Sequence, residues 1–237
     1  MPELVSVGRL QYTYDEYEHL LTSLLEEGYT FTDFSPLEPG EVVLRHDVDL
    51  SPRRALEMAR LEARLGVQST YCYLLTTPVY NLLEVEHVNA LKEIVALGHD
   101  VALHFDTYHY WSGRPGPDEL RTRVRSECDV IGQLLGQEID VVSFHRPPSW
   151  VLDVDFDGFL NTYSPQFFSE TTYISDSSQK WRAESPFPES RPEHVQLLVH
   201  PGLWGPTPQG MDDILADLAV RRHADVDAYL DPMESRV

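Results

Sequence analysis

The segment Val42-Val43-Leu44-Arg45-His46-Asp47-Val48-Asp49-Leu50-Ser51-Pro52 carries the signals that decide the fold. Its three leading apolar residues predict a short buried strand. Ser51 followed by Pro52 is typical of a helix start, because serine caps a first turn well and proline fits the first helical position. The segment therefore predicts a strand that passes directly into a helix, with ionisable side chains at the junction.

The same alternation of strand and helix continues along the chain. Apolar and β-branched runs predict strands over residues 41–45, 67–75, 100–105, 139–144 and 195–199. Apolar residues at helical spacing predict helices over 15–27, 51–65, 84–97, 117–135 and 211–222. We expect long loops with one or two short strands over 146–194, which are rich in Pro, Ser, Asp and aromatic residues. The short connections elsewhere favour parallel βαβ units in an α/β fold.

Composition limits the classes of partner. The 237 residues include 18 Lys+Arg and 39 Asp+Glu, which gives a formal net charge of −21. This charge repels phosphate backbones and anionic lipid surfaces, so we expect neither nucleic acid nor membrane as a partner. The length fits a single domain, and the sequence favours no particular oligomeric state.

The sequence also predicts a cellular location. The first ten residues lack the basic and apolar pattern of a signal peptide, and no run approaches the roughly 18 apolar residues of a membrane span. Two cysteines, Cys72 and Cys128, cannot form a disulfide framework. We therefore expect a cytoplasmic protein.

Ionisable residues follow four of the predicted strands. They are Asp47 and Asp49, His104 with Asp106, His145 with Arg146, and His200. Because the carboxyl ends of parallel strands meet at one edge of a sheet, we expect these side chains to form an active site.

The residue types at these strand ends indicate metal-assisted hydrolysis. A carboxylate with two or three histidines is a usual ligand set for Zn²⁺ or another borderline divalent ion. A second carboxylate can act as a base toward a metal-bound water, and a histidine across the site can protonate the leaving group. This combination suits hydrolysis of an amide or an ester.

Five motifs, in this order, resemble the polysaccharide deacetylase family, the NodB-homology domain of carbohydrate esterase family four. They lie at residues 45–49, 98–106, 145–148, 175–181 and 198–201. The resemblance implies a distorted, incomplete (β/α) barrel of about seven parallel strands. We place this barrel over residues 41–222 of a single domain, with an N-terminal helical extension over 1–40 and a C-terminal tail over 223–237.

The resemblance also implies roles for individual residues. Asp47 corresponds to the catalytic base and His200 to the general acid. Arg146 corresponds to the arginine that braces the base. Asp49 and His104 correspond to metal ligands.

Other side chains are expected to contact the substrate. Trp181 matches the family's aromatic lining of the substrate groove, and Trp150 and Trp204 follow strand-end motifs where they could flank a sugar ring. Arg45 and Arg146 could offset the charge of an anionic substrate.

The third metal ligand departs from the family pattern. Tyr108 stands where the family has its second metal histidine, and His109 comes one position later. His145 is the alternative, and we favour it because a strand end fixes a side chain better than a loop does.

Together these features predict a metal-dependent hydrolase, with zinc as the expected metal. It would remove an acetyl or formyl group from an amino sugar, a sugar nucleotide or a related small metabolite. The missing second histidine leaves an alternative open, in which the chain is an inactive relative that binds a carbohydrate or metabolite.

Overall fold

One parallel sheet organises the molecule. The computed structural model describes residues 8–187 and 192–234. Within them, seven strands follow the order β6-β5-β4-β3-β2-β8-β7, β1 also pairs with β2, and every pairing is parallel. The strands are β1 (Thr30–Thr32), β2 (Glu41–Val48), β3 (Thr70–Leu74), β4 (Asp100–Phe105), β5 (Val141–Phe144), β6 (Leu160–Asn161), β7 (Thr172–Ser175) and β8 (His194–Val199).

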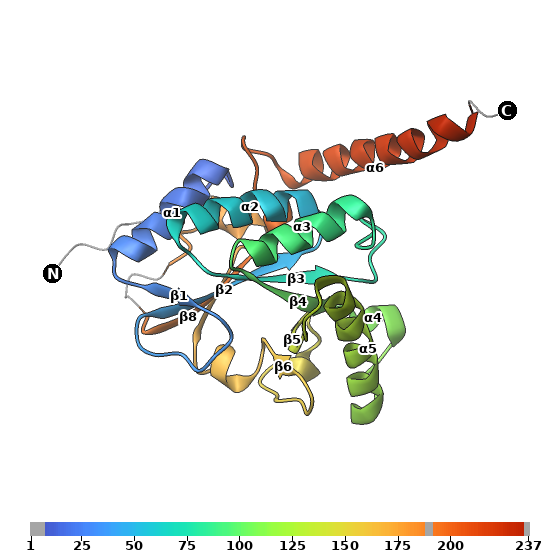
Figure 1. The fold of residues 1–237 in the computed structure, drawn as a ribbon. Coiled ribbons are helices and arrows are strands. Elements are labelled where there is room, and N and C mark those ends of the chain that lie inside the picture. Colours follow the sequence, from blue (N-terminus) through green and yellow to red (C-terminus); the bar gives the residue numbers. More distant parts are fainter. Residues whose placement is uncertain (1–7, 188–191, 235–237) are drawn as a thin grey trace.

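Helices flank this sheet. They are α1 (Tyr14–Glu26), α2 (Pro52–Leu65), α3 (Val85–Ala96), α4 (Thr107–Tyr110), α5 (Pro117–Leu135) and α6 (Met211–Glu234). Figure 1 shows α1, α2 and α3 together over one face of the curled sheet. The predicted fold class, a distorted and incomplete (β/α) barrel with about seven parallel strands, is confirmed.

The predicted elements agree closely with the structure, and two differences stand out. Strand β1 lies within residues 1–40, where we expected only a helical extension, and three residues are too few to show a strand period. Helix α6 continues to Glu234 instead of ending at residue 222. None of the helices in residues 8–187 and 192–234 is long and apolar enough to cross a membrane.

The junction between β2 and α2 is built as the sequence predicts. The Ser51 hydroxyl accepts a hydrogen bond from the amide of Arg54 at 3.2 Å, and Pro52 occupies the first helical position. The helix ends at Gly66, which has a φ of 70° and so adopts the left-handed conformation that favours glycine.

Behind β2, a buried carboxylate joins the strand to α2. His46 points away from Asp47, and its Nε2 lies 2.7 Å from Oε1 of Glu62. Tyr17 donates to the same oxygen at 2.5 Å, while Tyr71 donates to Oε2 at 2.9 Å. All four side chains are buried. A fully partnered carboxylate of this kind fixes the position of α2 against the strand that carries Asp47.

A second buried carboxyl links α4 to α5. The hydroxyl of Tyr110 donates to Oε1 of Glu127, whereas Oε2 of Glu127 is buried without a hydrogen-bond partner. Burial raises the pKa of Glu127 from its ordinary value of 4.5 to about 7, although the Tyr110 hydrogen bond and the charge of Arg123 act in the opposite direction. The protonated form is therefore favoured in the folded state.

This shift predicts a pH dependence of stability. Because the folded-state pKa is raised, the contribution of Glu127 is full below pH 4.5 and is lost as the pH rises through about 7. We expect Glu127→Gln to become more stable relative to the wild type over this interval, as measured by urea unfolding at a series of pH values. The exposed substitution Glu86→Gln is the control, and a constant difference between wild type and Glu127→Gln would contradict the assignment.

Candidate metal centre and active site

Four strands bring ionisable side chains to one end of the sheet. Asp47 lies in β2 and Asp49 just after it, His104 lies in β4, and His145 and His200 follow β5 and β8. Strands β4 and β5 are neighbours, and His104 is directly opposite Ser143 in their register. The amide of His145 donates to the carbonyl of Phe105 at 2.9 Å, which extends this pairing beyond the strand.

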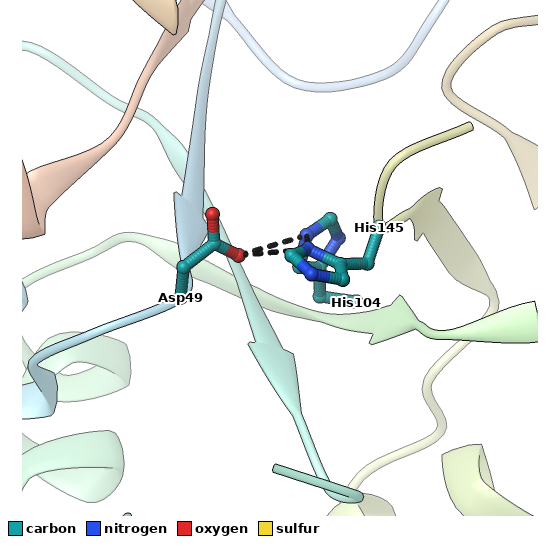
Figure 2. Close-up of side chains that lie close together, drawn as sticks. All are labelled: Asp49, His104 and His145. Carbon is teal, nitrogen blue, oxygen red and sulfur yellow. Dashed lines mark hydrogen bonds and ion pairs between the residues drawn. The ribbon is translucent and has the colours of Figure 1, made fainter. Parts of the chain in front are cut away.

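Asp49, His104 and His145 converge on one point, as Figure 2 shows. Oδ1 of Asp49 lies 3.1 Å from Nε2 of His104 and 3.2 Å from Nδ1 of His145. The two histidine nitrogens are 3.2 Å apart. Three potential ligand atoms thus face one another at the end of the sheet, and they are the three residues that we favoured from the sequence.

The chemistry of this set fits a divalent metal ion. Oδ1 of Asp49 is buried, and neither close histidine contact gives it a hydrogen bond of acceptable geometry. Burial opposes ionisation of Asp49, but His104 and His145 favour it and lower the pKa well below its ordinary range. An ionised carboxylate beside two imidazole nitrogens is a donor set that suits zinc and similar ions.

Ser143 sets the orientation and tautomer of His104. Its hydroxyl donates to Oδ1 of Asp47 at 3.0 Å, so it can only accept from Nδ1 of His104, which lies 2.9 Å away. This places the imidazole hydrogen on Nδ1 and leaves Nε2, the atom that faces Asp49, with a free lone pair. A metal-ligating histidine needs this arrangement.

Arg45 braces Asp47 in the buried interior. Its Nε and Nη2 donate to the two oxygens of Asp47 at 3.0 and 2.7 Å. Burial opposes ionisation of Asp47, but Arg45, His104 and His200 together outweigh it and lower the pKa to about 2. Asp47 is therefore a carboxylate, held in one orientation by two parallel charge-assisted hydrogen bonds.

Two predictions about arginines need correction. We expected Arg45 to contact substrate, but its side chain is 0% exposed. We expected Arg146 to brace the base, but its side chain is 65% exposed and donates to Asp106 at 3.1 Å. Arg146 has a φ of 46°, in the left-handed region, where the chain turns after β5. Arg45 takes the bracing position because it lies on the same strand face as Asp47, two residues away.

His200 is held by a buried carboxylate that our sequence analysis did not assign. Nδ1 of His200 lies 2.5 Å from Oδ1 of Asp176, and Nε1 of Trp204 donates to Oδ2 of Asp176 at 2.8 Å. Burial opposes protonation of His200, but the carboxylates of Asp176, Asp49 and Asp47 together outweigh it and raise the pKa to about 9. Nε2 of His200 lies 3.9 Å from Oδ2 of Asp49, so the imidazolium faces the candidate metal centre.

The predicted tryptophan contacts also need correction. Trp181 is 1% exposed and Trp204 is 0% exposed, so neither reaches a substrate. Both pack around Tyr12, whose ring centroid lies 6.2 Å from that of Trp181 and 4.7 Å from that of Trp204. The N-terminal segment covers these indoles, and this long-range contact has no signal in the local sequence.

Trp150 and His109 lie away from the candidate centre. Trp150 packs edge-on against Phe144, with 6.5 Å between ring centroids, and is absent from the described residues that line the cavities at the centre. His109 is exposed on α4 and does not join the Asp49 cluster. His145, not His109, therefore belongs to the candidate ligand set.

Two cavities meet at the candidate centre. One, of about 370 Å³, is lined by Asp47 and by polar and aromatic residues, among them Tyr163, Tyr173, Ser175 and Lys180. The other, of about 500 Å³, has an apolar wall that includes Leu74, Val79, Leu203, Met211 and Leu215. Asp49, His145 and His200 line both. A ligand in either cavity would lie against the three ionisable groups.

The sequence analysis missed Ser143, Asp176 and Tyr163. Ser143 is a polar residue within the apolar run of β5, and Asp176 directly follows β7. These positions at the ends of strands were the signal by which the two residues could have been found. The hydroxyl oxygen of Tyr163 accepts a hydrogen bond from Nη2 of Arg45 at 2.6 Å. Tyr163 lies in a loop segment with no periodic pattern, so its position gave no such signal.

Comparisons with known proteins found similarity to solved structures. No family model matches the chain, and no curated protein is similar in sequence. A family 4 acetyl xylan esterase from Clostridium thermocellum is 18% identical, with 76% of this chain and 84% of that chain covered and a TM-score of 0.43. A family 4 carbohydrate esterase from Bacillus anthracis is 14% identical, with 88% and 86% covered and a TM-score of 0.42.

A CE4 family pseudoenzyme from Bacillus anthracis is similar to the same degree. It is 15% identical, with 79% of this chain and 63% of that chain covered and a TM-score of 0.45. At these identities and TM-scores, neither membership of the family nor an activity follows for this chain.

The buried ion pair between Arg45 and Asp47 predicts a specific effect on stability. Arg45→Met should lower the free energy of unfolding by about 3–5 kcal/mol, because it leaves the Asp47 carboxylate buried without its counter-charge. Adding Asp47→Asn should recover part of this loss, and the exposed Arg64→Met should stay within about 0.5 kcal/mol of the wild type. Urea unfolding measures all three. A double variant no more stable than Arg45→Met would contradict the pairing.

Proposed function

We propose that the protein is a metal-dependent hydrolase that removes an N-acyl group, acetyl or formyl, from an amino sugar or a related small metabolite. The observation that carries the proposal is the convergence of Asp49, His104 and His145 within 4.8 Å of one another, beside His200. We further propose that it acts in the cytoplasm and that zinc is the metal.

Asp49, His104 and His145 would hold the ion. A divalent metal there would polarise the acyl oxygen and make water a better nucleophile at neutral pH. The free lone pair on Nε2 of His104 and the ionised carboxylate of Asp49 support this assignment. The position of His145 beside Asp49 and His104 supports a hydrolase over the inactive alternative, because the missing second histidine was what motivated that alternative.

Asp47 and His200 would carry out the proton transfers of the reaction. Asp47 lines the smaller cavity as an ionised carboxylate, so it would accept the proton of the attacking water. A carboxylate with a pKa of about 2 is a weak base, and a bound metal would offset this because it would make the water more acidic. His200 carries a proton because Asp176 stabilises the imidazolium, and its Nε2 faces the centre. It is placed to protonate the departing amine.

Metal binding is the first test. Isothermal titration calorimetry with zinc should show one binding site in the wild type. His145→Ala should lower the zinc affinity at least about 100-fold, because loss of a direct ligand costs more affinity than loss of a group that only orients a ligand. His109→Ala is the matched control and should bind zinc as the wild type does. Equal affinity in wild type and His145→Ala would contradict the ligand set.

Hydrolysis is the second test. With a panel of N-acetyl and N-formyl amino sugars, the protein should release free acetate or formate, which an isomerase or a lyase would not. His200→Gln should lower kcat by about 10²–10⁴-fold, the usual contribution of a positioned acid, with zinc affinity unchanged. An undiminished kcat in this variant would contradict its role as acid.

A further inference from the structure

A third cavity, outside the candidate centre, has a different chemical character. It has a volume of about 540 Å³ and lies between α1, α2, α6 and the segment after Leu203. Three arginines line it, Arg53 and Arg54 from α2 and Arg221 from α6. Leu50 and Gly202 line both this cavity and the larger cavity at the candidate centre.

Two of these arginines are unpaired. Across residues 8–187 and 192–234, Arg53 and Arg221 make neither a hydrogen bond nor an ion pair through their side chains. Arg54 donates to the carbonyl of Gly202 at 2.8 Å and to Oε1 of Gln209 at 2.5 Å, both uncharged acceptors. Arg53 and Arg221 are exposed and Arg54 is half-buried. Within the described residues none of the three forms an ion pair, although the chain has 39 acidic and 18 basic residues.

The two carboxylates in this cavity already have other hydrogen-bond partners. Glu57 and Asp217 also line it. Glu57 accepts from Nη1 of Arg60 at 3.1 Å, and Asp217 accepts from Nε2 of Gln209 at 2.6 Å. Three guanidinium groups against two carboxylates leave the cavity with a net positive charge, within a strongly acidic protein.

The arginines are close enough to act on one another and on Tyr14. Burial lowers the pKa of Arg54, and the charge of Arg221 lowers it further, although Tyr14 and Asp217 oppose this. Burial raises the pKa of Tyr14, while the charges of Arg54, Arg53 and Arg221 all oppose the rise. Gathering like charges costs free energy, and a bound anion would offset that cost.

We propose that this cavity binds the phosphate or diphosphate group of a small-molecule ligand through Arg53, Arg54 and Arg221. Guanidinium groups match the geometry of phosphate oxygens and bind them through paired, charge-assisted hydrogen bonds. The hydroxyl of Thr207 lines the same cavity and offers a further donor. The site does not depend on the proposed hydrolysis.

Helix α6 connects the anion site to the candidate centre. It carries Arg221 in one cavity and Met211 and Leu215 in the other. Beyond these residues it extends away from the rest of the molecule, as Figure 1 shows. An anion held between α2 and α6 would fix this helix against the body and so fix the apolar wall beside the candidate centre.

Calorimetric titration of the full chain with inorganic phosphate tests the site. The double variant Arg53→Ala/Arg221→Ala should bind phosphate at least about tenfold more weakly than the wild type, since each arginine contributes charge-assisted hydrogen bonds. Arg64→Ala, an exposed change on α2 outside the cavity, should bind as the wild type does. Absence of binding by the wild type at millimolar phosphate, or equal binding by the double variant, would overturn the proposal.

A second titration identifies the source of the phosphate. The phosphate group could belong to the sugar substrate, and this possibility rests on the proposed function. In that case N-acetylglucosamine 1-phosphate should bind more tightly than inorganic phosphate. If a separate ligand supplies it, the two should bind alike. In both cases the double variant should bind more weakly and should keep wild-type zinc affinity, so failure of the anion site is distinguishable from failure of the metal centre. Equal weakening by Arg64→Ala would overturn the site.

Discussion

The buried ion pair between Arg45 and Asp47 is the constraint on which the candidate site depends. A guanidinium has five N–H donors, and all of those of Arg45 are satisfied. Two go to Asp47 and the others go to Thr162, Gln196 and Tyr163. Because a buried charge without partners is costly, this set fixes β2 against the loop segment at 162–163 and against β8. The position of Asp49, two residues beyond Asp47, follows from that arrangement.

From this pair, a chain of polar contacts reaches the candidate metal centre. Ser143 connects Asp47 to Nδ1 of His104, and Nε2 of His104 faces Asp49. On the other side, Asp176 holds His200 toward the same carboxylate. Asp47, His104 and His200 are therefore each oriented by a buried partner. This preorganisation is what a hydrolytic centre requires, since its donors must be in place before charge develops.

Much of this arrangement could be predicted from sequence, because it depends on local patterns. Alternating strands and helices set the sheet, and parallel strands bring Asp49, His104 and His145 to one edge. The identity of the bracing arginine could not be predicted from the motif alone. Arg146 lies next to the site in sequence, but only the strand face decides that Arg45 reaches Asp47. Burial of Trp181 and Trp204 depends on contacts with Tyr12, which is distant in the sequence. The sequence around each tryptophan therefore does not predict its burial.

We infer that Asp49, His104 and His145 together bind a divalent metal ion. Anomalous diffraction from crystals of the full chain grown with zinc tests this claim most directly. We expect one strong peak within about 2.0–2.2 Å of Nε2 of His104, Nδ1 of His145 and an oxygen of Asp49, the usual zinc-to-nitrogen and zinc-to-oxygen distances. A map with no peak between these atoms, or with a peak at His109 instead, would contradict it.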